Sequence, residues 1–135
     1  MKLITRDTDY AIRALCYIAE SKGDTVSASR IVKSLKIPRP FLRKILQRLN
    51  KEGLLKSHKG LGGGFTLAER VDDILIVDLI KIFQGGVRLN ECVFKKKPCP
   101  NVESCPLKKK IDAIQEQVVG QLRSITIGKL LKRGR

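Results

Sequence analysis

Residues 38–67, PRPFLRKILQRLNKEGLLKSHKGLGGGFTL, decide the fold of this chain. Apolar residues recur at helical spacing until Gly53, a residue type that commonly ends helices, so this part predicts a helix from about Pro38 to Glu52. Proline is tolerated in the first turn of a helix, which explains Pro38 and Pro40 at its start. We expect a buried face made of Phe41, Leu42, Ile45, Leu46 and Leu49. We expect an exposed, mostly basic face made of Arg39, Arg43, Lys44, Gln47, Arg48 and Lys51.

The rest of this stretch predicts a β-hairpin directly after the helix. Leu54–His58 and Phe65–Leu67 have strand composition, and the glycine-rich segment 59–64 predicts the turn between them. This layout is typical of a winged helix. A nucleotide-binding glycine loop is disfavoured, because a helix should follow such a loop and a strand-like segment follows here. The hairpin residues that we expect to meet the DNA backbone or minor groove are His58, Lys59, Gly62 and Gly63.

Two further helices are expected before this stretch. The first runs from about Thr8 to Ser21, with Asp7 or Thr8 as its cap and an apolar stripe that contains Cys16, which we interpret as a small buried residue. The second is capped by Ser27 and buries Ala28, Ile31, Val32 and Leu35. Two short helices joined by a tight turn predict a helix-turn-helix. Its second helix would meet base edges or phosphates in the major groove through Arg39, Arg43, Lys44 and Gln47.

Three of the four cysteines lie in one segment: Cys92, Cys99 and Cys105. Prolines next to these thiols exclude a regular helix, so we expect a loop that presents three sulfur atoms in a small volume. In a reducing cytoplasm, grouped cysteines more often bind metal or react than form structural disulfides. An iron–sulfur cluster, a zinc ion and a metal-free thiol sensor all stay open. Zinc is disfavoured, because structural zinc sites bring closely spaced ligand pairs and about four ligands in all.

After a short helix expected from Ile76 to Gln84, the C-terminal part predicts a longer helix from about Leu107 to Ser124. Apolar residues follow it at a spacing of about 3.5 residues, as in paired helices. This seam consists of Ile111, Ile114, Val118, Leu122 and Ile125. We expect it to form a homodimer, and the alternative is that it packs on its own domain. Thr126 would cap a last helical turn that runs to Leu131.

The expected fold class is mainly α with a small β-hairpin. A winged helix-turn-helix DNA-binding domain would span residues 1–85, a cysteine-rich cluster-binding loop residues 86–106, and a dimerisation helix with a basic tail residues 107–135.

The charge of the chain indicates the kind of partner. The 135 residues include 28 Lys and Arg against 13 Asp and Glu, a net charge of +15, which predicts an anionic partner. The sequence contains no apolar run as long as a membrane span, and it does not open with a signal peptide. We therefore expect a cytoplasmic protein that binds nucleic acid and not a membrane.

Three features together resemble a known family: the opening TDYAIRAL at residues 8–15, the wing GLGGGF at residues 60–65, and the spacing of the three cysteines. The chain is similar to the winged-helix transcription regulators that include the iron–sulfur regulator IscR and the nitric-oxide-sensing repressor NsrR. The resemblance spans nearly the whole chain, including ITIGKL at residues 125–130. It implies a homodimer joined by the long helix, and an iron–sulfur cluster on the three cysteines. Some relatives keep the fold without a cluster.

The resemblance also suggests a fourth ligand. In the IscR branch a histidine follows the third cysteine by three residues, and here that position is Lys108, which cannot bind iron while protonated. In the NsrR branch an aspartate from the first helix of the other subunit completes a 4Fe–4S cluster, and Asp9 matches it. The plain alternative is that Asp9 is an acidic residue favoured at a helix N-terminus. A carboxylate is a weaker iron ligand than a thiolate, so nitric oxide or oxygen could displace it.

These observations favour a sequence-specific DNA-binding transcription regulator, expected to be a repressor of a roughly palindromic operator on double-stranded DNA. A 4Fe–4S or 2Fe–2S cluster would control it by sensing nitric oxide, redox state or iron status. The alternative is a metal-free regulator of the same fold that responds to thiol oxidation, a small ligand or a partner protein. An enzyme is not predicted, because the sequence lacks a Cys-x-x-Cys pair and a nucleophile–base constellation.

Overall fold

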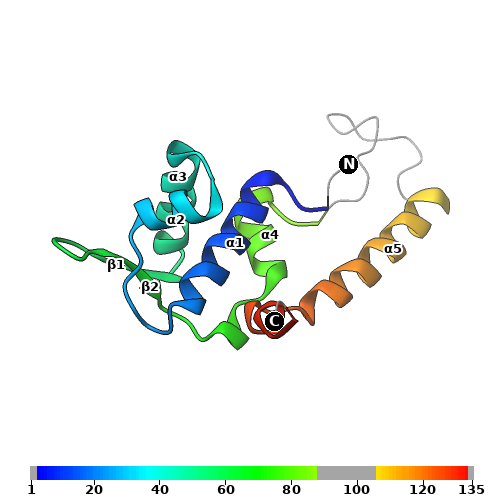
Figure 1. Ribbon diagram of the computed structural model, residues 1–135. Coiled ribbons are helices and arrows are strands. Elements are labelled where there is room, and N and C mark those ends of the chain that lie inside the picture. The colour runs from blue at the N-terminus through cyan, green and yellow to red at the C-terminus, as the bar shows by residue number, and fades with distance from the viewer. Residues whose placement is uncertain (1–2, 88–105, 134–135) are drawn as a thin grey trace.

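The computed structural model describes residues 3–87 and 106–133 of the chain. The described elements are α1 (Arg6–Glu20), α2 (Ala28–Leu35), α3 (Arg39–Lys51), β1 (Leu55–His58), β2 (Gly64–Leu67), the 3₁₀ turn η1 (Val71–Asp73), α4 (Ile76–Gln84), α5 (Pro106–Arg123) and α6 (Ile127–Arg133). The two strands pair antiparallel, with Leu55 opposite Leu67 and His58 opposite Gly64. The expected fold class, mainly helical with a small hairpin, is confirmed (Figure 1).

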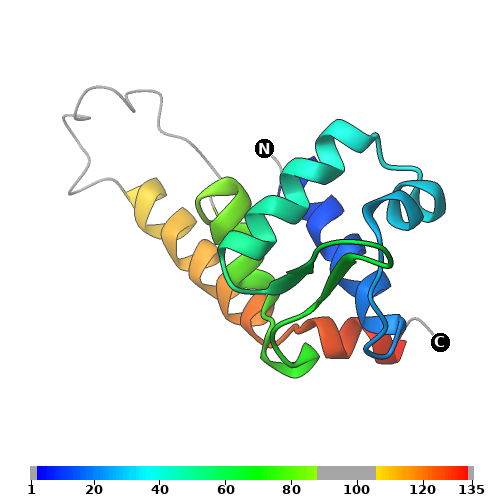
Figure 2. The same cartoon turned by 90° about the vertical axis from the view of Figure 1, so that its left-hand side faces the viewer.

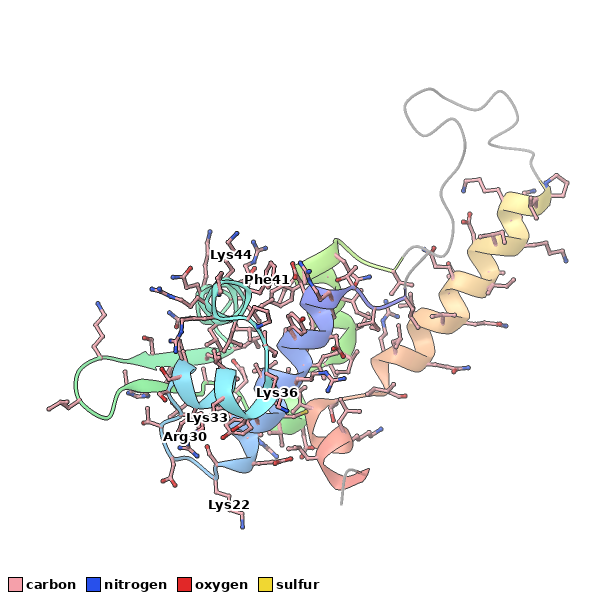
Figure 3. All side chains as sticks on the ribbon, turned by 45° about the horizontal axis from the view of Figure 1, so that its top comes forward. Lys22, Arg30, Lys33, Lys36, Phe41 and Lys44 are labelled. Carbon is pink, nitrogen blue, oxygen red and sulfur yellow. The ribbon has the colours of Figure 1, made fainter. Side chains whose placement is uncertain are left out.

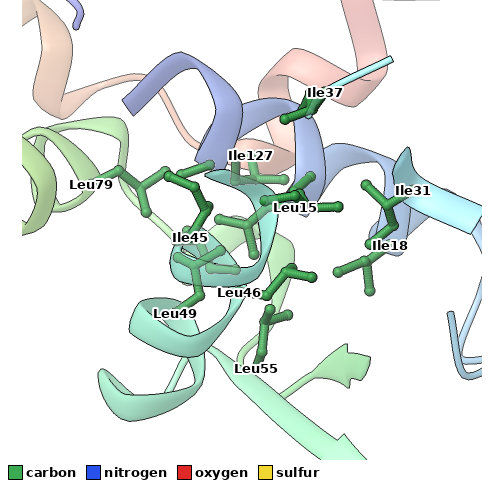
Figure 4. Packing of buried hydrophobic residues seen from close by; sticks show 14 of the residues in the cluster. Leu15, Ile18, Ile31, Ile37, Ile45, Leu46, Leu49, Leu55, Leu79 and Ile127 are labelled. Carbon is green, nitrogen blue, oxygen red and sulfur yellow. The ribbon is translucent and has the colours of Figure 1, made fainter. Parts of the chain in front are cut away.

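Helix α1 is the central element and packs against α2, α3, α4, α6 and β2. Its inner stripe is almost fully buried and consists of Ala11, Ala14, Leu15 and Ile18. Leu15 and Ile18 lie among side chains from α2, α3 and β1, as Figure 4 shows. Full burial of a large aliphatic side chain contributes about 1.5–3 kcal/mol, so this stripe accounts for much of the stability of the domain.

The start of α1 differs from the expectation. Thr5 is the N-cap, and its hydroxyl accepts a hydrogen bond from the Thr8 backbone N–H at 3.4 Å, so Asp7 and Thr8 lie inside the helix. Thr8 is fully buried and donates its hydroxyl to the side chain of Gln84 at the end of α4. The cap lies earlier than predicted because Thr8 is used for this tertiary contact.

Two side chains predicted to be buried are less enclosed than expected. Phe41, in the first turn of α3, is 36% exposed, whereas Leu42, Ile45, Leu46 and Leu49 are buried as predicted. The prediction that Phe41 is buried was wrong. The start of α1 lies beside Phe41, and Arg6 from this segment covers only one side of the ring. Cys16 packs at the edge of the core but is only half-buried.

The hairpin is joined to the chain before α2. Val26 and Phe65 exchange backbone hydrogen bonds, with N–O distances of 3.0 and 2.8 Å, so Val26 forms an isolated antiparallel β-bridge with β2. Gly64, at φ +153°, lies so close to Val26 that a Cβ atom would collide with the Val26 carbonyl group. This contact fixes the direction in which the hairpin leaves the body.

The C-terminal part returns to the same core. Helix α5 runs beside α4 and extends away from the body (Figure 2). The seam on α5 is divided, because Val118, Leu122 and Ile125 pack against the core, whereas Ile114 is 48% exposed. Backbone hydrogen bonds pair the chain after α5 with the start of α4, and Ile127 of α6 is fully buried. Thr126 accepts a hydrogen bond from the Lys129 backbone N–H, so the predicted cap of the last helix is confirmed.

None of the helices in the described ranges is both long and apolar enough to cross a membrane.

Replacement of Gly64 by Ala should lower the free energy of unfolding by about 3 kcal/mol or more, because the new methyl group has no space beside the Val26 backbone. Gly62→Ala is the matched control, since Gly62 also has positive φ but a Cβ atom there would have no neighbouring atom within 4 Å. It should cost only about 1 kcal/mol. Urea unfolding followed by circular dichroism measures both. Equal costs would show that the contact with Val26 is unimportant.

Candidate nucleic-acid interface and cysteine segment

Helix α3 has the geometry of a recognition helix. Pro40 in its first turn suits the start of a helix, and the buried stripe from Leu42 to Leu49 holds one side against α1. The opposite side is therefore turned to solvent. All of the residues predicted to contact DNA from this helix are exposed, namely Arg39, Arg43, Lys44 and Gln47. The structure brings them together on one helix surface.

Two of the cations of α3 have partners within the chain. Arg39 donates from Nη2 to the Ser29 hydroxyl at 3.2 Å, which ties the start of α3 to α2. Arg48 forms an ion pair with Glu52 at 3.6 Å. Arg43 and Lys44 form no ion pair with any residue that the structure describes, so their charges are available to an external anion.

Phe41 and Arg6 form a contact that the sequence reasoning missed. The Arg6 guanidinium carbon lies 4.2 Å from the centroid of the Phe41 ring, the geometry of a cation–π interaction. This contact joins the first turn of α1 to the first turn of α3. The one sequence feature that could have indicated this contact is the position of Phe41 in the first turn of a helix. Neighbouring elements cover less of the surface there than in the middle of a helix.

The hairpin projects from the body next to α3, as a wing does (Figure 1). Lys59 is exposed just after β1, and His58 is also exposed while its Nε2 lies 2.9 Å from the Thr66 hydroxyl across the hairpin. The two predicted glycines are needed for different reasons. Gly62 has φ +75°, whereas a Cβ atom at Gly63 would collide with the His58 carbonyl oxygen. The tip can therefore approach a backbone closely. Leu61, which has no predicted role, is fully exposed at this tip.

The three cysteines predicted to bind metal, Cys92, Cys99 and Cys105, lie outside the described residues. Among residues 3–87 and 106–133, no group of three or more His, Cys, Asp or Glu side chains could hold a metal ion. Lys108, at the position of the histidine ligand in the IscR branch, forms an ion pair with Asp112 at 2.7 Å.

Cys16 has different surroundings from those expected of a ligand. Burial raises the pKa of its thiol, and the negative charge of Glu20 raises it further. Iron binds thiolates, so both effects disfavour metal binding at Cys16. Its position at the edge of the core supports the interpretation as a packing residue.

Asp9 lies half-buried in the first turn of α1. Its Oδ2 accepts a hydrogen bond from Arg13 Nε at 2.8 Å, and this bond, together with the Asp9 charge, raises the pKa of Arg13. The pair is largely exposed, so it contributes little to stability. Asp9 could therefore exchange its contact with Arg13 for another cationic partner at low cost.

Gln84 joins the end of α4 to the start of α1. Its Oε1 accepts hydrogen bonds from the Thr5 backbone N–H at 3.1 Å and from the Thr8 hydroxyl at 2.8 Å. Its Nε2 donates to the Leu3 carbonyl oxygen at 3.0 Å. Gln84 is the last residue of α4, shortly before the cysteine segment, and the helix turn that it holds also carries Asp9. We call this group of hydrogen bonds the Gln84 junction.

Comparison with known proteins identifies the family. Residues 4–133 match the model of the Rrf2 family, described as iron-dependent transcriptional regulators. A protein of Aquifex aeolicus, provisionally described as an HTH-type transcriptional regulator, is 34% identical over 90% of this chain and 86% of its own length. The HTH-type transcriptional repressor NsrR of Streptomyces coelicolor is 27% identical over 95% of this chain and 87% of its own.

Solved structures agree with this assignment. The structure of T. potens IscR superposes with a TM-score of 0.76 at 25% identity, over 100% of this chain and 89% of that one. CymR, the global cysteine regulator of B. subtilis, shares the fold with a TM-score of 0.74 at 23% identity, over 98% of both chains. This chain therefore belongs to the Rrf2 family and is a winged-helix DNA-binding transcription regulator, not an enzyme.

Proposed function

We propose that this regulator represses transcription by binding a roughly palindromic operator as a homodimer, and that an iron–sulfur cluster on Cys92, Cys99 and Cys105 controls the binding. The observation that carries the DNA-binding part is the exposed face of α3 beside the wing, with Arg43 and Lys44 free of ion-pair partners among the described residues. The name of the Streptomyces coelicolor relative supports repression.

In the proposed docking, α3 lies in the major groove with Arg39, Arg43, Lys44 and Gln47 toward bases or phosphates. The wing reaches the backbone or minor groove with His58, Lys59, Gly62 and Gly63. The buried stripe of α3 supports this division of roles, because it leaves the opposite face unable to turn inward. Two such units in a symmetric dimer would contact half-sites about 34–36 Å apart.

The first half of α5 supports the proposed homodimer. No residue of α5 is fully buried, and Leu107 and Ile114 are 67% and 48% exposed. Both lie on the seam side of the helix, whereas the second half of the seam packs on its own domain. A second copy of α5 would cover the exposed half. The proposal keeps the division predicted from the sequence, with residues 1–85 as DNA-binding domain, 86–106 as cluster loop and 107–135 as dimerisation segment.

The donor set suits an iron–sulfur cluster. Three thiolates and one carboxylate, from Asp9 of the second subunit, are ligands that iron accepts, whereas Lys108 is paired with Asp112. A cluster would supply a centre that reacts with nitric oxide or oxidants. In this chain Asp9 would exchange its exposed contact with Arg13 for the cluster, and the Gln84 junction ties the turn that carries Asp9 to the end of α4. The family description as iron-dependent supports this proposal.

The second candidate is a metal-free regulator that responds to thiol oxidation, a small ligand or a partner protein. The similarity of the fold to CymR favours it, because that protein is named a cysteine regulator. In this case the loop cysteines would be thiol-switch or structural residues.

The roles of α3 and the wing can be separated by two substitutions, measured on an operator that the wild-type protein selects from random duplexes. Arg43→Ala should reduce discrimination at one base pair by about 1–3 kcal/mol, because a side chain that reads a base is lost. Lys59→Ala should weaken binding to all duplexes and lower the salt slope by about 1, because one phosphate contact is lost. Unchanged base preference in the Arg43 variant would contradict the docking.

Anaerobic purification with iron and sulfide assays tests the cluster. The wild-type protein should contain matching amounts of both, and Cys92→Ser/Cys99→Ser/Cys105→Ser should contain neither. Cys16→Ser is the matched control and should keep its iron, because that thiol is not a ligand. A colourless wild-type protein after anaerobic reconstitution would contradict the cluster and leave the metal-free regulator.

The same preparation tests the fourth ligand. Asp9→Asn should change the visible spectrum, whereas Arg13→Gln, which breaks the same ion pair but keeps the carboxylate, should not.

Ile114→Glu should weaken dimerisation about a hundredfold or more, because an unpaired carboxylate would be buried between the two helices. Ala113→Glu adds the same charge at an exposed position on the other side of α5 and should have little effect. Sedimentation velocity over a range of concentrations measures the association. A wild-type monomer, or an unchanged dimer in the Ile114 variant, would argue against this interface.

A further inference from the structure

A second group of cations lies outside the proposed recognition surface. Arg30 and Lys33 are exposed on α2, Lys36 is exposed at its C-cap, and Lys22 is exposed in the turn after α1. In Figure 3, Lys44 lies on α3, whereas these four residues follow α2 and the end of α1. We call them the α2 basic surface. The ion pairs found within residues 3–87 and 106–133 involve other cations, so these four charges have no carboxylate partner there.

The backbone conformation at two of these lysines is unfavourable for any residue that has a side chain. Lys22 and Lys36 have φ of +55° and +56°, and they are the only residues other than glycine with positive φ in the described part of the chain. This left-handed conformation disfavours a lysine, and glycine would adopt it without strain. The turns themselves do not require a lysine side chain. Because both strained lysines belong to the same surface, a function of their positive charge is the simplest physical reason for them.

Polar groups beside Arg30 make this surface suited to phosphate. The Tyr17 hydroxyl lies 2.9 Å from the Ser34 hydroxyl. Arg30 lies one turn before Ser34 on α2, so its guanidinium group is on the same side of the helix as this pair of hydroxyl groups. Arginine, lysine, tyrosine and serine side chains are the usual donors to DNA phosphates.

The composition of this surface favours DNA over an acidic protein. The large apolar side chains exposed in the described ranges are Leu3, Phe41, Leu61, Leu107 and Ile114, and none of them belongs to α2. The centres of protein interfaces are enriched in aromatic residues and poor in lysine, which is the opposite of what is found here. The hydrogen bond from Arg39 to Ser29 also connects α2 with the start of the recognition helix, so the two surfaces adjoin.

We propose that the α2 basic surface, formed by Lys22, Arg30, Lys33 and Lys36, binds phosphates of the DNA that flanks the sequence contacted by α3 and the wing. The inference rests on the proposed docking and extends it. The contact is independent of base sequence and lengthens the footprint beyond the half-site. It adds affinity only where duplex DNA continues past the operator.

Two duplexes test this inference, one limited to the sequence that the wild-type protein selects from random DNA and one extended by about 10 bp, one helical turn, at each end. For Arg30→Gln/Lys33→Gln, the slope of log K against log salt should fall by about 1.8 on the long duplex, at about 0.9 for each phosphate contact. It should not change on the short duplex. Lys81→Gln/Lys110→Gln removes the same charge from exposed positions on α4 and α5 and should leave both slopes unchanged.

Lys36→Gly provides a second test, because a purely structural role of Lys36 would not give the result that the proposal predicts. It should keep or raise the melting temperature, because glycine relieves the left-handed backbone, and still lower the salt slope on the long duplex by about 0.9.

An unchanged slope on the long duplex would overturn the proposal, and so would equal losses on both duplexes or an equal loss in the control variant. Failure of the wild-type protein to select any sequence would instead overturn the docking on which the inference rests.

Discussion

Burial of one face of α1 is the constraint on which the rest of the structure depends. Ala11, Ala14, Leu15 and Ile18 are at most 2% exposed, and the elements that cover them are those that carry the functional surfaces. The two alanines leave space for close approach of neighbouring helices, and the two larger residues fill the space between α2, α3 and β1. Any change of this packing would move α3 and the wing relative to each other.

The outward surfaces follow from this inward packing. Leu42 and Leu46 hold α3 on the core, and Leu55 does the same for β1, so the cations on the other sides have defined positions. Val26 and Gly64 then set the direction of the wing. The net charge of +15 accelerates association with any polyanion, whereas the base contact proposed for Arg43 would select where on a duplex the protein binds. Charge and geometry therefore have separate roles.

The Gln84 junction provides a physical connection through which the proposed cluster would influence DNA binding. The end of α4 is held to Thr5 and Thr8 by hydrogen bonds to one side-chain oxygen, and Arg6 in the same turn lies on Phe41 of α3. A movement of the end of α4 would therefore strain polar contacts that are partly buried and costly to leave unsatisfied.

Local sequence patterns predicted much of the fold, but they did not predict part of the candidate site. The stripe on α3, the glycine turn of the hairpin and the cap at Thr126 depend on residues close in the chain, and the structure has them as predicted. The family followed from the order of such motifs. The exposure predicted for the cations of α3 also holds, because the buried stripe determines it.

Only the tertiary structure decided the exposure of Phe41, the use of Thr8 as a partner of Gln84, and the division of the α5 seam into a covered and an exposed half. Periodicity shows which side of a helix is apolar, but it does not show how far the neighbouring element extends along that side. Arg6 and Phe41, or Thr8 and Gln84, meet because separate elements pack, and that packing is a property of the whole core.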